Sequence, residues 1–238
     1  TLDRSSAASD VYKRQGLFSA RMFAPGSPAA PRIFLWGVAM RVRLFVDYWN
    51  FQLTWNERTA KQRCDWGRLP SVFCAEAERA LSISGLGALT LEETRVYAGY
   101  EAGRENNLKN WLHNFLDRQP GVRVFTSERH WRKHSVHCRA CDKEHEKCPA
   151  CGAPFGRAAE KTVDARIVTD VVGLAWEGAY DVAILVSGDK DFIPAVEHVQ
   201  AKNFKVINAA WKNRGNELAK VCWASFDIDA LIGSLTRT

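Results

Sequence analysis

The chain has 238 residues, of which 46% are hydrophobic and 25% charged, the composition of a globular protein rather than of a collagen-like, disordered or disulfide-rich chain. Its longest apolar run, Ile33–Met40, has less than half of the roughly 20 residues that a membrane-spanning helix needs, so we expect no membrane-embedded part and no membrane partner. The formal net charge is +6, but residues 40–238 hold 28 basic against 25 acidic side chains, so charge alone is weak grounds for predicting an anionic partner.

The first 39 residues differ from the rest of the chain. Thr1–Gln15 has no apolar periodicity and three prolines break residues 25–31, so we expect a disordered leader. Ser5–Gln15 also resembles a translated cloning or sequencing adapter, and no signal peptide is indicated. We therefore interpret residues 1–39 as non-native, with the native protein beginning at Met40.

From Met40 onward, apolar runs that predict strands alternate with helically spaced segments. The predicted strands are 42–46, 94–97, 122–125, 182–186 and 205–209; the predicted helices are 69–81, 107–118, 162–176 and 192–201, followed by a helix and a strand between 216 and 228. This order predicts an α/β fold with a mainly parallel central sheet covered by helices on both faces. Residues 129–158 interrupt the alternation, so we predict a small insertion between two parts of one domain, 40–128 and 159–238.

Acidic residues follow the predicted strands or open the predicted helices. Asp47 follows strand 42–46, Asp189 and Asp191 follow strand 182–186, and Asp164 lies in the first turn of a helix. The carboxyl ends of parallel strands meet at one edge of a sheet, where grouped carboxylates need a cation or a raised pKa. Oxygen ligands suit Mg²⁺ or Mn²⁺, which can promote phosphodiester hydrolysis. The alternative is that Asp47 is a turn residue and that Asp164 and Asp191 are helix caps.

Three stretches resemble NYN domains, a branch of the PIN-like nuclease superfamily. Phe45–Phe51 is similar to the family's first strand, which ends in Asp followed closely by Asn. Lys161–Asp164 resembles its Lys-x-Val-Asp helix start, and Ile184–Phe192 resembles its Ser-Gly-Asp-x-Asp-Phe stretch. The resemblance spans about 41–232 in the right order. It implies a three-layer α/β/α PIN-like fold and a metal-dependent ribonuclease activity.

The resemblance also implies roles for single residues. Asp47, Asp164 and Asp189 would be catalytic ligands of Mg²⁺ or Mn²⁺, with Asp191 beside them, and Asn50 and Ser187 would steady the first loop or contact the substrate. Two features depart from the family pattern. Tyr48 and Trp49 are bulky where family members usually have a small residue or glycine; they could stack on bases or fill the core. A further acid has only Glu101 and Glu105 as candidates, both of which we expect on the solvated surface, and we expect at most a supporting role for Asp170.

Four of the seven cysteines form two Cys-x-x-Cys pairs, Cys138 with Cys141 and Cys148 with Cys151. Their segment has too little apolar content to fold alone, and a tetrahedral Zn²⁺ would supply the missing free energy. We predict a structural zinc knuckle, with disulfides or an iron–sulfur cluster as alternatives. An odd number of cysteines with one metal site also favours a reducing cytoplasm over secretion.

Basic and aromatic residues lead into the cysteine segment. Arg129, Trp131, Arg132 and Lys133 match the needs of phosphate contact and base stacking, although an ordinary solvated loop is the alternative. Further basic residues lie in the cysteine segment, namely Arg139, Lys143 and Lys147. Three nearby histidines could replace a cysteine ligand: His130, His134 and His137.

Together these patterns predict a metal-dependent endoribonuclease-like protein that binds RNA and carries a zinc-knuckle insertion. A non-catalytic RNA-binding or regulatory module of the same fold is the first alternative. A phosphatase-type hydrolase is the second, because the Asp189-x-Asp191 pair after a strand could form an aspartyl-phosphate.

Overall fold

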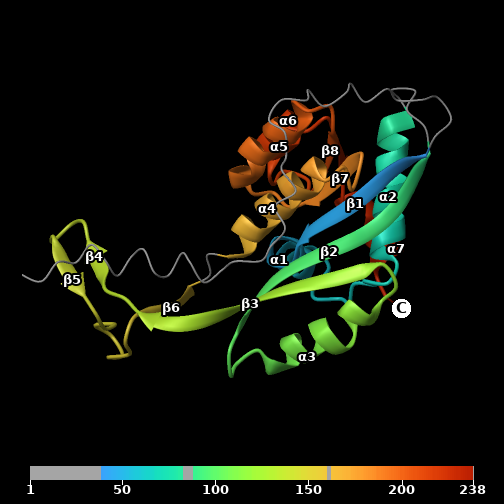
Figure 1. The fold of residues 1–238 in the computed structure, drawn as a ribbon. Coiled ribbons are helices and arrows are strands. Elements are labelled where there is room, and N and C mark those ends of the chain that lie inside the picture. Colours follow the sequence, from blue (N-terminus) through green and yellow to red (C-terminus); the bar gives the residue numbers. More distant parts are fainter. Residues whose placement is uncertain (1–38, 83–87, 160–161, 238) are drawn as a thin grey trace, which may run out of the picture. The chain divides into compact units, whose positions relative to one another are not determined.

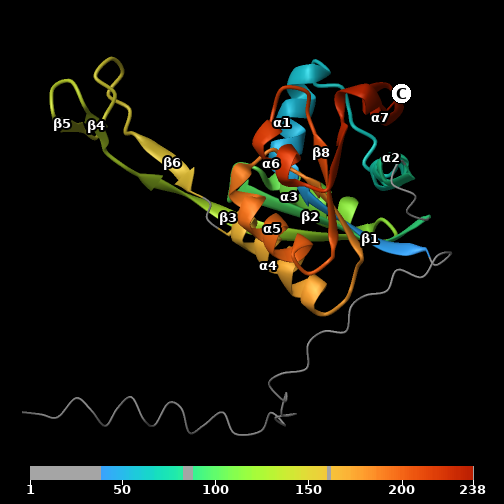
Figure 2. The same ribbon diagram turned by 90° about the horizontal axis from the view of Figure 1, so that it is seen from above.

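A parallel sheet of six strands is the centre of the fold (Figures 1 and 2). The computed structural model describes residues 39–82, 88–159 and 162–237, so residues 1–38 of the expected leader and Lys161 of the helix-start motif lie outside the described residues. The strands are β1 (Met40–Asp47), β2 (Leu89–Glu101), β3 (Val122–Lys133), β7 (Val182–Val186), β8 (Lys205–Ala210) and β9 (Ala224–Asp227). The predicted α/β class with a mainly parallel sheet is confirmed.

The strand order is β3-β2-β1-β7-β8-β9, so the direction of growth of the sheet reverses between β1 and β7. The two strands are parallel and directly paired, with Val46 opposite Val186. Their carboxyl ends therefore lie side by side, while the connections that leave them run to opposite sides of the sheet. Such a reversal leaves a crevice beyond the strand ends, the usual ligand site of an open α/β sheet.

Helices cover both faces of the sheet (Figure 1). One face carries α1 (Tyr48–Arg58), α2 (Leu69–Ser82), α3 (Asn106–Asn114) and α7 (Ile232–Leu235); the other carries α4 (Val163–Trp176), α5 (Ile193–Gln200) and α6 (Asn216–Val221). Alternate strand residues supply the two cores, because successive side chains point to opposite faces. Leu44 and Val46 enter the first core and Phe45 enters the second, and all three are fully buried. The predicted three layers are confirmed.

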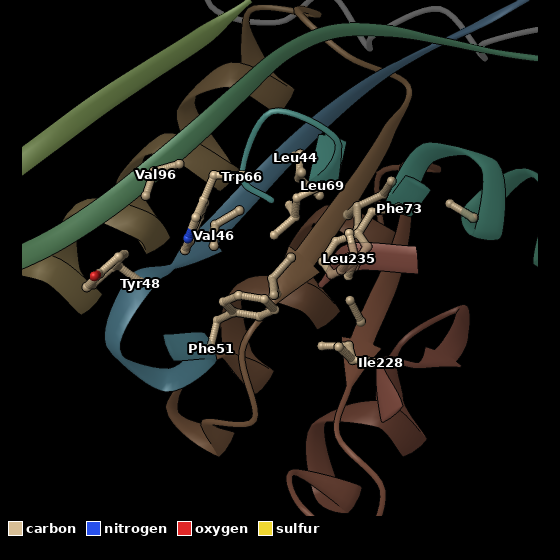
Figure 3. Close-up of a cluster of buried hydrophobic side chains, with 14 of the residues drawn as sticks. Leu44, Val46, Tyr48, Phe51, Trp66, Leu69, Phe73, Val96, Ile228 and Leu235 are labelled. Carbon is tan, nitrogen blue, oxygen red and sulfur yellow. The ribbon is translucent and has the colours of Figure 1, made fainter. Parts of the chain in front are cut away.

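Helix α1 is an element that the sequence analysis missed. The sequence analysis places no helix between Asp47 and Leu69, a segment that is rich in aromatic residues. In the structure Asp47 caps the helix by accepting a hydrogen bond from the backbone N–H of Asn50 at 3.2 Å. Phe51 and Trp55 are buried one turn apart, and Figure 3 shows Phe51 within the aromatic and aliphatic cluster below the sheet. Tertiary packing therefore stabilises a helix that the local pattern does not reveal.

Other differences concern the ends of elements. β2 begins at Leu89 and β3 continues to Lys133, well beyond the predicted 94–97 and 122–125. The predicted helix 107–118 divides into α3 and a 3₁₀ turn at Leu116–Arg118. None of the helices in the described ranges is both long and apolar enough to traverse a bilayer.

The cysteine segment, residues 129–158, continues from the edge of the sheet. The outer half of β3, from His130 to Lys133, pairs antiparallel with β6 (Gly156–Ala159). Between these strands, β4 (Val136–Cys138) and β5 (Lys143–His145) form a separate two-stranded sheet, visible beyond β6 in Figure 1. The start of the predicted insertion is therefore a continuation of a core strand rather than a loop.

Replacing Phe51 with Ala tests the aromatic cluster. Its fully buried ring lies 5.3 Å from Trp66 and 5.5 Å from Trp211, measured between ring centroids. The resulting cavity should lower the free energy of unfolding by about 3–5 kcal/mol in urea titrations. Leu53→Ala, on the same helix but 58% exposed, is the control and should change it by less than about 0.5 kcal/mol. Equal urea midpoints for the two variants would contradict this account.

Candidate active site

Asp47 links the two central strands at the reversal point. It ends β1 with only 9% of its surface exposed. While Oδ1 accepts the hydrogen bond from Asn50 N–H, Oδ2 accepts one from the hydroxyl of Ser187 at 3.2 Å. Ser187 directly follows β7, so this one carboxylate holds the loop after β1 against the loop after β7.

The loop after β7 is held in place by further hydrogen bonds. The side-chain carbonyl of Asn50 accepts one from the backbone N–H of Gly188 at 2.9 Å. The hydroxyl of Ser187 accepts one from Asp189 N–H at 3.2 Å, and Asp189 Oδ1 accepts one from Asp191 N–H at 2.9 Å. Asp47 and Asp189 thus act as helix caps, whereas the capping alternative drawn from the sequence concerns Asp164 and Asp191, with a turn role for Asp47. Because the Asp189 cap engages Oδ1, the capping role leaves Asp189 Oδ2 available for another role.

A close backbone contact brings a third loop to the site. Gly215 has a φ of +68°, and a Cβ at this position would overlap the Cα of Gly188. Only glycine permits both the left-handed conformation and this approach without strain. The contact places Arg214, which precedes Gly215, beside the loop after β7.

Four carboxylates from three chain segments act on one another at this point. Burial, together with the neighbouring charges of Asp164 and Asp189, raises the pKa of Asp47 to about 6 against the opposing effect of the hydrogen bonds from Asn50 and Ser187. Partial burial and the charges of Asp189 and Asp191 also raise the pKa of Asp164, in the first turn of α4. Among the described residues, no lysine, arginine or histidine forms an ion pair with any of these four acids. The repulsion is therefore not relieved by a described basic side chain.

Two of the four acids, Asp47 and Asp164, line a hollow of about 480 Å³, and Asp189 follows directly after Gly188 of its lining. Its lining includes Asp47, Asn50, Asp164, Gly188, Trp49, Trp211 and Arg214. Arg214 is a residue that the sequence analysis missed, because only the contact between Gly188 and Gly215 brings it here. Its guanidinium donates hydrogen bonds to Thr54 Oγ1 at 3.2 Å and to the Glu57 carboxylate at 2.6 Å, so its position at the rim is fixed and part of its charge is offset by Glu57.

The oxygen atoms that line the hollow are suitable ligands for a hard divalent cation. Carboxylate oxygens are the preferred ligands of Mg²⁺ and Mn²⁺, and a cation would offset the cost of ionising Asp47 in a buried position. The carboxylates are farther apart than in a formed metal site, since no group of three or more His, Cys, Asp or Glu side chains in the described ranges is spaced to hold a metal ion. Ion binding would therefore require the side chains to adjust, or water to complete the coordination.

Other predicted acids are engaged elsewhere. Asp170 accepts a hydrogen bond from the Tyr97 hydroxyl at 2.8 Å and pairs with Arg95 and Arg166, which makes it part of a structural network. Glu101 and Glu105, expected on the solvated surface, are instead half-buried, and this expectation was wrong. Glu101 pairs with Arg104, and Glu105 accepts hydrogen bonds from the backbone N–H of Glu101 and from Arg129.

The predicted basic and aromatic residues lie along β3 and do not line the acidic hollow. Arg129 is tied to Glu105 at 2.6 Å, and its guanidinium lies over the Trp49 ring, 5.1 Å from the centroid. Trp131 is 41% exposed and its ring covers Gly156 of the neighbouring strand. Arg132 and Lys133 are exposed, so their charges are available to a partner.

Each Cys-x-x-Cys pair directs backbone amide groups at its first sulfur, but in the described ranges the two pairs are not gathered into a group of three or more side chains that could hold a metal ion. The pKa of the Cys138 thiol is lowered by hydrogen bonds from the backbone N–H groups of Cys141 and Ala140 and from the Cys141 side chain. The Cys148 pKa is lowered in the same way by its own partners, Cys151 and Ala150. In both pairs, amide groups aim at the first sulfur and favour its thiolate form. Near the first pair, His145 Nε2 lies 3.9 Å from Cys141 Sγ, a contact made by a histidine that the sequence analysis did not single out.

Replacing Asp47 with Asn should stabilise the protein in the presence of EDTA. The amide can still cap α1, but it carries no charge. Below about pH 4 both the folded and the unfolded wild-type protein hold the Asp47 proton, and above about pH 6 both have lost it. The gain in the free energy of unfolding should therefore appear as the pH rises from about 4 to about 6, and reach at most about 3 kcal/mol.

Urea titrations at several pH values measure this gain. Glu144→Gln, which removes an exposed carboxylate from the cysteine segment, is the control and should show no such pH dependence. A gain from Asp47→Asn that is equal at pH 4 and pH 8 would contradict the assigned role of burial and repulsion.

Comparisons with known proteins agree with this geometry. A sequence model of the NYN domain family matches residues 41–229. The structure is similar to the crystal structure of a protein of unknown function from Vibrio parahaemolyticus, with 19% identity and a TM-score of 0.50 over 80% of this chain and 95% of that chain; this likeness concerns the fold alone. A search of curated proteins returned no match. The match over most of the chain, together with acids at the reversal point of a parallel sheet, shows that the chain belongs to the NYN domain family of the PIN-like nuclease superfamily.

Proposed function

We propose that this protein is a divalent-metal-dependent endoribonuclease that hydrolyses RNA at the acidic hollow. The observation that carries the proposal is the convergence of Asp47, Asp164, Asp189 and Asp191 beyond the ends of β1 and β7, without an ion pair to any described basic residue. A cluster of carboxylates with raised pKa values in a hollow is typical of a functional site. Family membership supports a nuclease over other hydrolases.

The chain's own residues have separable tasks in this proposal. Asp47, Asp164 and Asp189 would hold Mg²⁺ or Mn²⁺, which when bound would supply positive charge and Lewis acidity at the scissile phosphate. Ser187 orients Asp47, and Asn50 keeps the loop after β7 at a constant distance from α1. Arg214 would be placed at the rim to contact the phosphodiester, although its ion pair with Glu57 offsets part of its charge.

The cysteine segment would add affinity for RNA. Trp131 offers an exposed ring, and Arg132 and Lys133 offer unshielded charges along the outer half of β3. Arg129 contributes less charge than the sequence implied, because Glu105 pairs with it. In this proposal the four cysteines hold a structural Zn²⁺, which requires their thiols to stay reduced and so favours a cytoplasmic location.

A non-catalytic RNA-binding module is the second candidate. It is favoured by the spacing of the acids, since no three described ligand-type side chains are gathered closely enough for a metal ion. Such a module would bind RNA with equal affinity whether or not Mg²⁺ is present, and would leave the strand intact.

Asp189→Asn separates the two candidates. It should reduce Mg²⁺-dependent cleavage of a single-stranded RNA by at least about 100-fold, because it removes one of the charges that would hold the metal ion at the reacting phosphate. Binding of the same RNA in EDTA should stay within about twofold of wild type, since the variant keeps the cap to Asp191 N–H.

Asp227→Asn is the matched control. Asp227 ends the outermost strand β9, and it accepts a hydrogen bond from Asp229 N–H as Asp189 does from Asp191 N–H. This variant should cleave RNA at the wild-type rate. Full activity of Asp189→Asn would refute catalysis at the hollow, and RNA binding without cleavage by the wild-type protein would favour the second candidate.

The zinc proposal predicts one tightly bound zinc ion per chain, released when the thiols are modified. Cys148→Ser should abolish this zinc, as measured by elemental analysis of the purified protein. Cys74→Ser changes a cysteine of α2, outside both pairs, and should retain it. Wild-type protein purified without zinc, with two disulfides detected by mass spectrometry, would overturn the assignment.

A further inference from the structure

A second hollow, of about 770 Å³, lies beside the acidic one between α1 and α3. Trp49 lines both hollows, so they meet at this indole. The indole is held in place by a hydrogen bond from Nε1 to the backbone carbonyl of Gly99 at 2.5 Å. A strand of RNA whose phosphate occupies the first hollow would therefore pass the mouth of the second.

Aromatic rings form the floor and wall of this second hollow. Tyr48 and Trp66 stack with centroids 5.5 Å apart and are almost fully buried, so they form a fixed floor. Trp111 packs edge-on against Trp66 at 5.9 Å and stacks with Phe115, which is 39% exposed. The site therefore offers flat apolar surfaces that are open to solvent at one end.

Polar groups on the same hollow fit the edge of a nucleobase. Gln52 Nε2 donates a hydrogen bond to Asn56 Oδ1 at 2.8 Å. That bond leaves Gln52 Oε1 as an acceptor and Asn56 Nδ2 as a donor, side by side on adjacent turns of α1. A paired donor and acceptor of this kind is how amide side chains recognise base edges.

The charges around the hollow favour an anionic ligand over an apolar peptide. Arg63 and Arg237 line it, and neither forms an ion pair with a residue in the described ranges. The two acids of the lining are engaged, Asp65 by the backbone N–H groups of Gly67 and Arg68 and Glu105 by Arg129. The unengaged guanidinium groups can therefore contact phosphates.

We propose that this aromatic hollow binds an unpaired nucleobase of RNA, next to the phosphodiester held at the acidic hollow. The inference rests on the proposed function for its substrate class, and it makes the protein selective for single strands. A base within a duplex is already stacked and paired, so it cannot enter the hollow without loss of those contacts.

Phe115→Ala tests the proposal by fluorescence anisotropy in EDTA, with a labelled single-stranded RNA of about a dozen nucleotides and the same sequence as a duplex. Loss of one stacking surface should weaken binding of the single strand by about 5- to 100-fold. Binding of the duplex should not change, so the preference for single strands should disappear. Arg63→Ala, an exposed position, should weaken both RNAs by a similar, smaller factor.

Trp176→Ala is the control, because Trp176 is 64% exposed at the end of α4 on the opposite face of the sheet. It should bind both RNAs as the wild type does, and thermal unfolding should show that all variants fold. Unchanged single-strand binding by Phe115→Ala would overturn the proposal. If the single-strand preference depends on Phe115 but Mg²⁺ gives no cleavage of any RNA, the base site stands and the hydrolytic function falls.

Discussion

The site depends on a buried negative charge at the point where the strand order reverses. Asp47 would be costly to ionise in this position, because it is almost out of contact with water and faces other carboxylates. Hydrogen bonds from Asn50 N–H and Ser187 offset part of that cost. The same bonds join the loops after β1 and β7. The groups that hold the two halves of the sheet together at this edge are thus the groups that shape the acidic hollow.

Helix α1 connects this edge to the rest of the molecule. Its first residue follows Asp47 directly, and its buried side packs Phe51 and Trp55 into the core on one face of the sheet. Its remaining surface lines both hollows, through Trp49 and Leu53 on one side and Gln52 on the other. A helix fixed by aromatic packing therefore sets the positions of the acids and of the aromatic hollow together. Any movement of α1 would alter both.

The cysteine segment extends this arrangement along β3. Arg129 lies where the strand leaves the core, and its charge is used internally by Glu105 and Trp49. Farther along the strand, Arg132 and Lys133 have exposed side chains, and the knuckles beyond them aim amide groups at sulfur. Near the sheet, the charge of Arg129 is thus paired within the protein. Farther along β3, the charges of Arg132 and Lys133 are available to a partner. A zinc ion would be needed mainly to stabilise the distal part, which has little apolar surface to bury.

Features with a local cause could be predicted from the sequence by itself. Apolar runs such as 182–186 become buried parallel strands, acids that follow them reach one edge of the sheet, and each Cys-x-x-Cys spacing forms a turn. The tertiary structure alone decided the rest. Helix α1 has no clear amphipathic pattern, and tertiary packing stabilises it instead. Asp170 and Glu105 are paired with arginines that are far away in the sequence. Arg214 reaches the acidic hollow through the contact between Gly188 and Gly215. Such long-range contacts leave no periodic pattern along the chain, so only the folded structure shows which charges are paired and which remain exposed to a ligand.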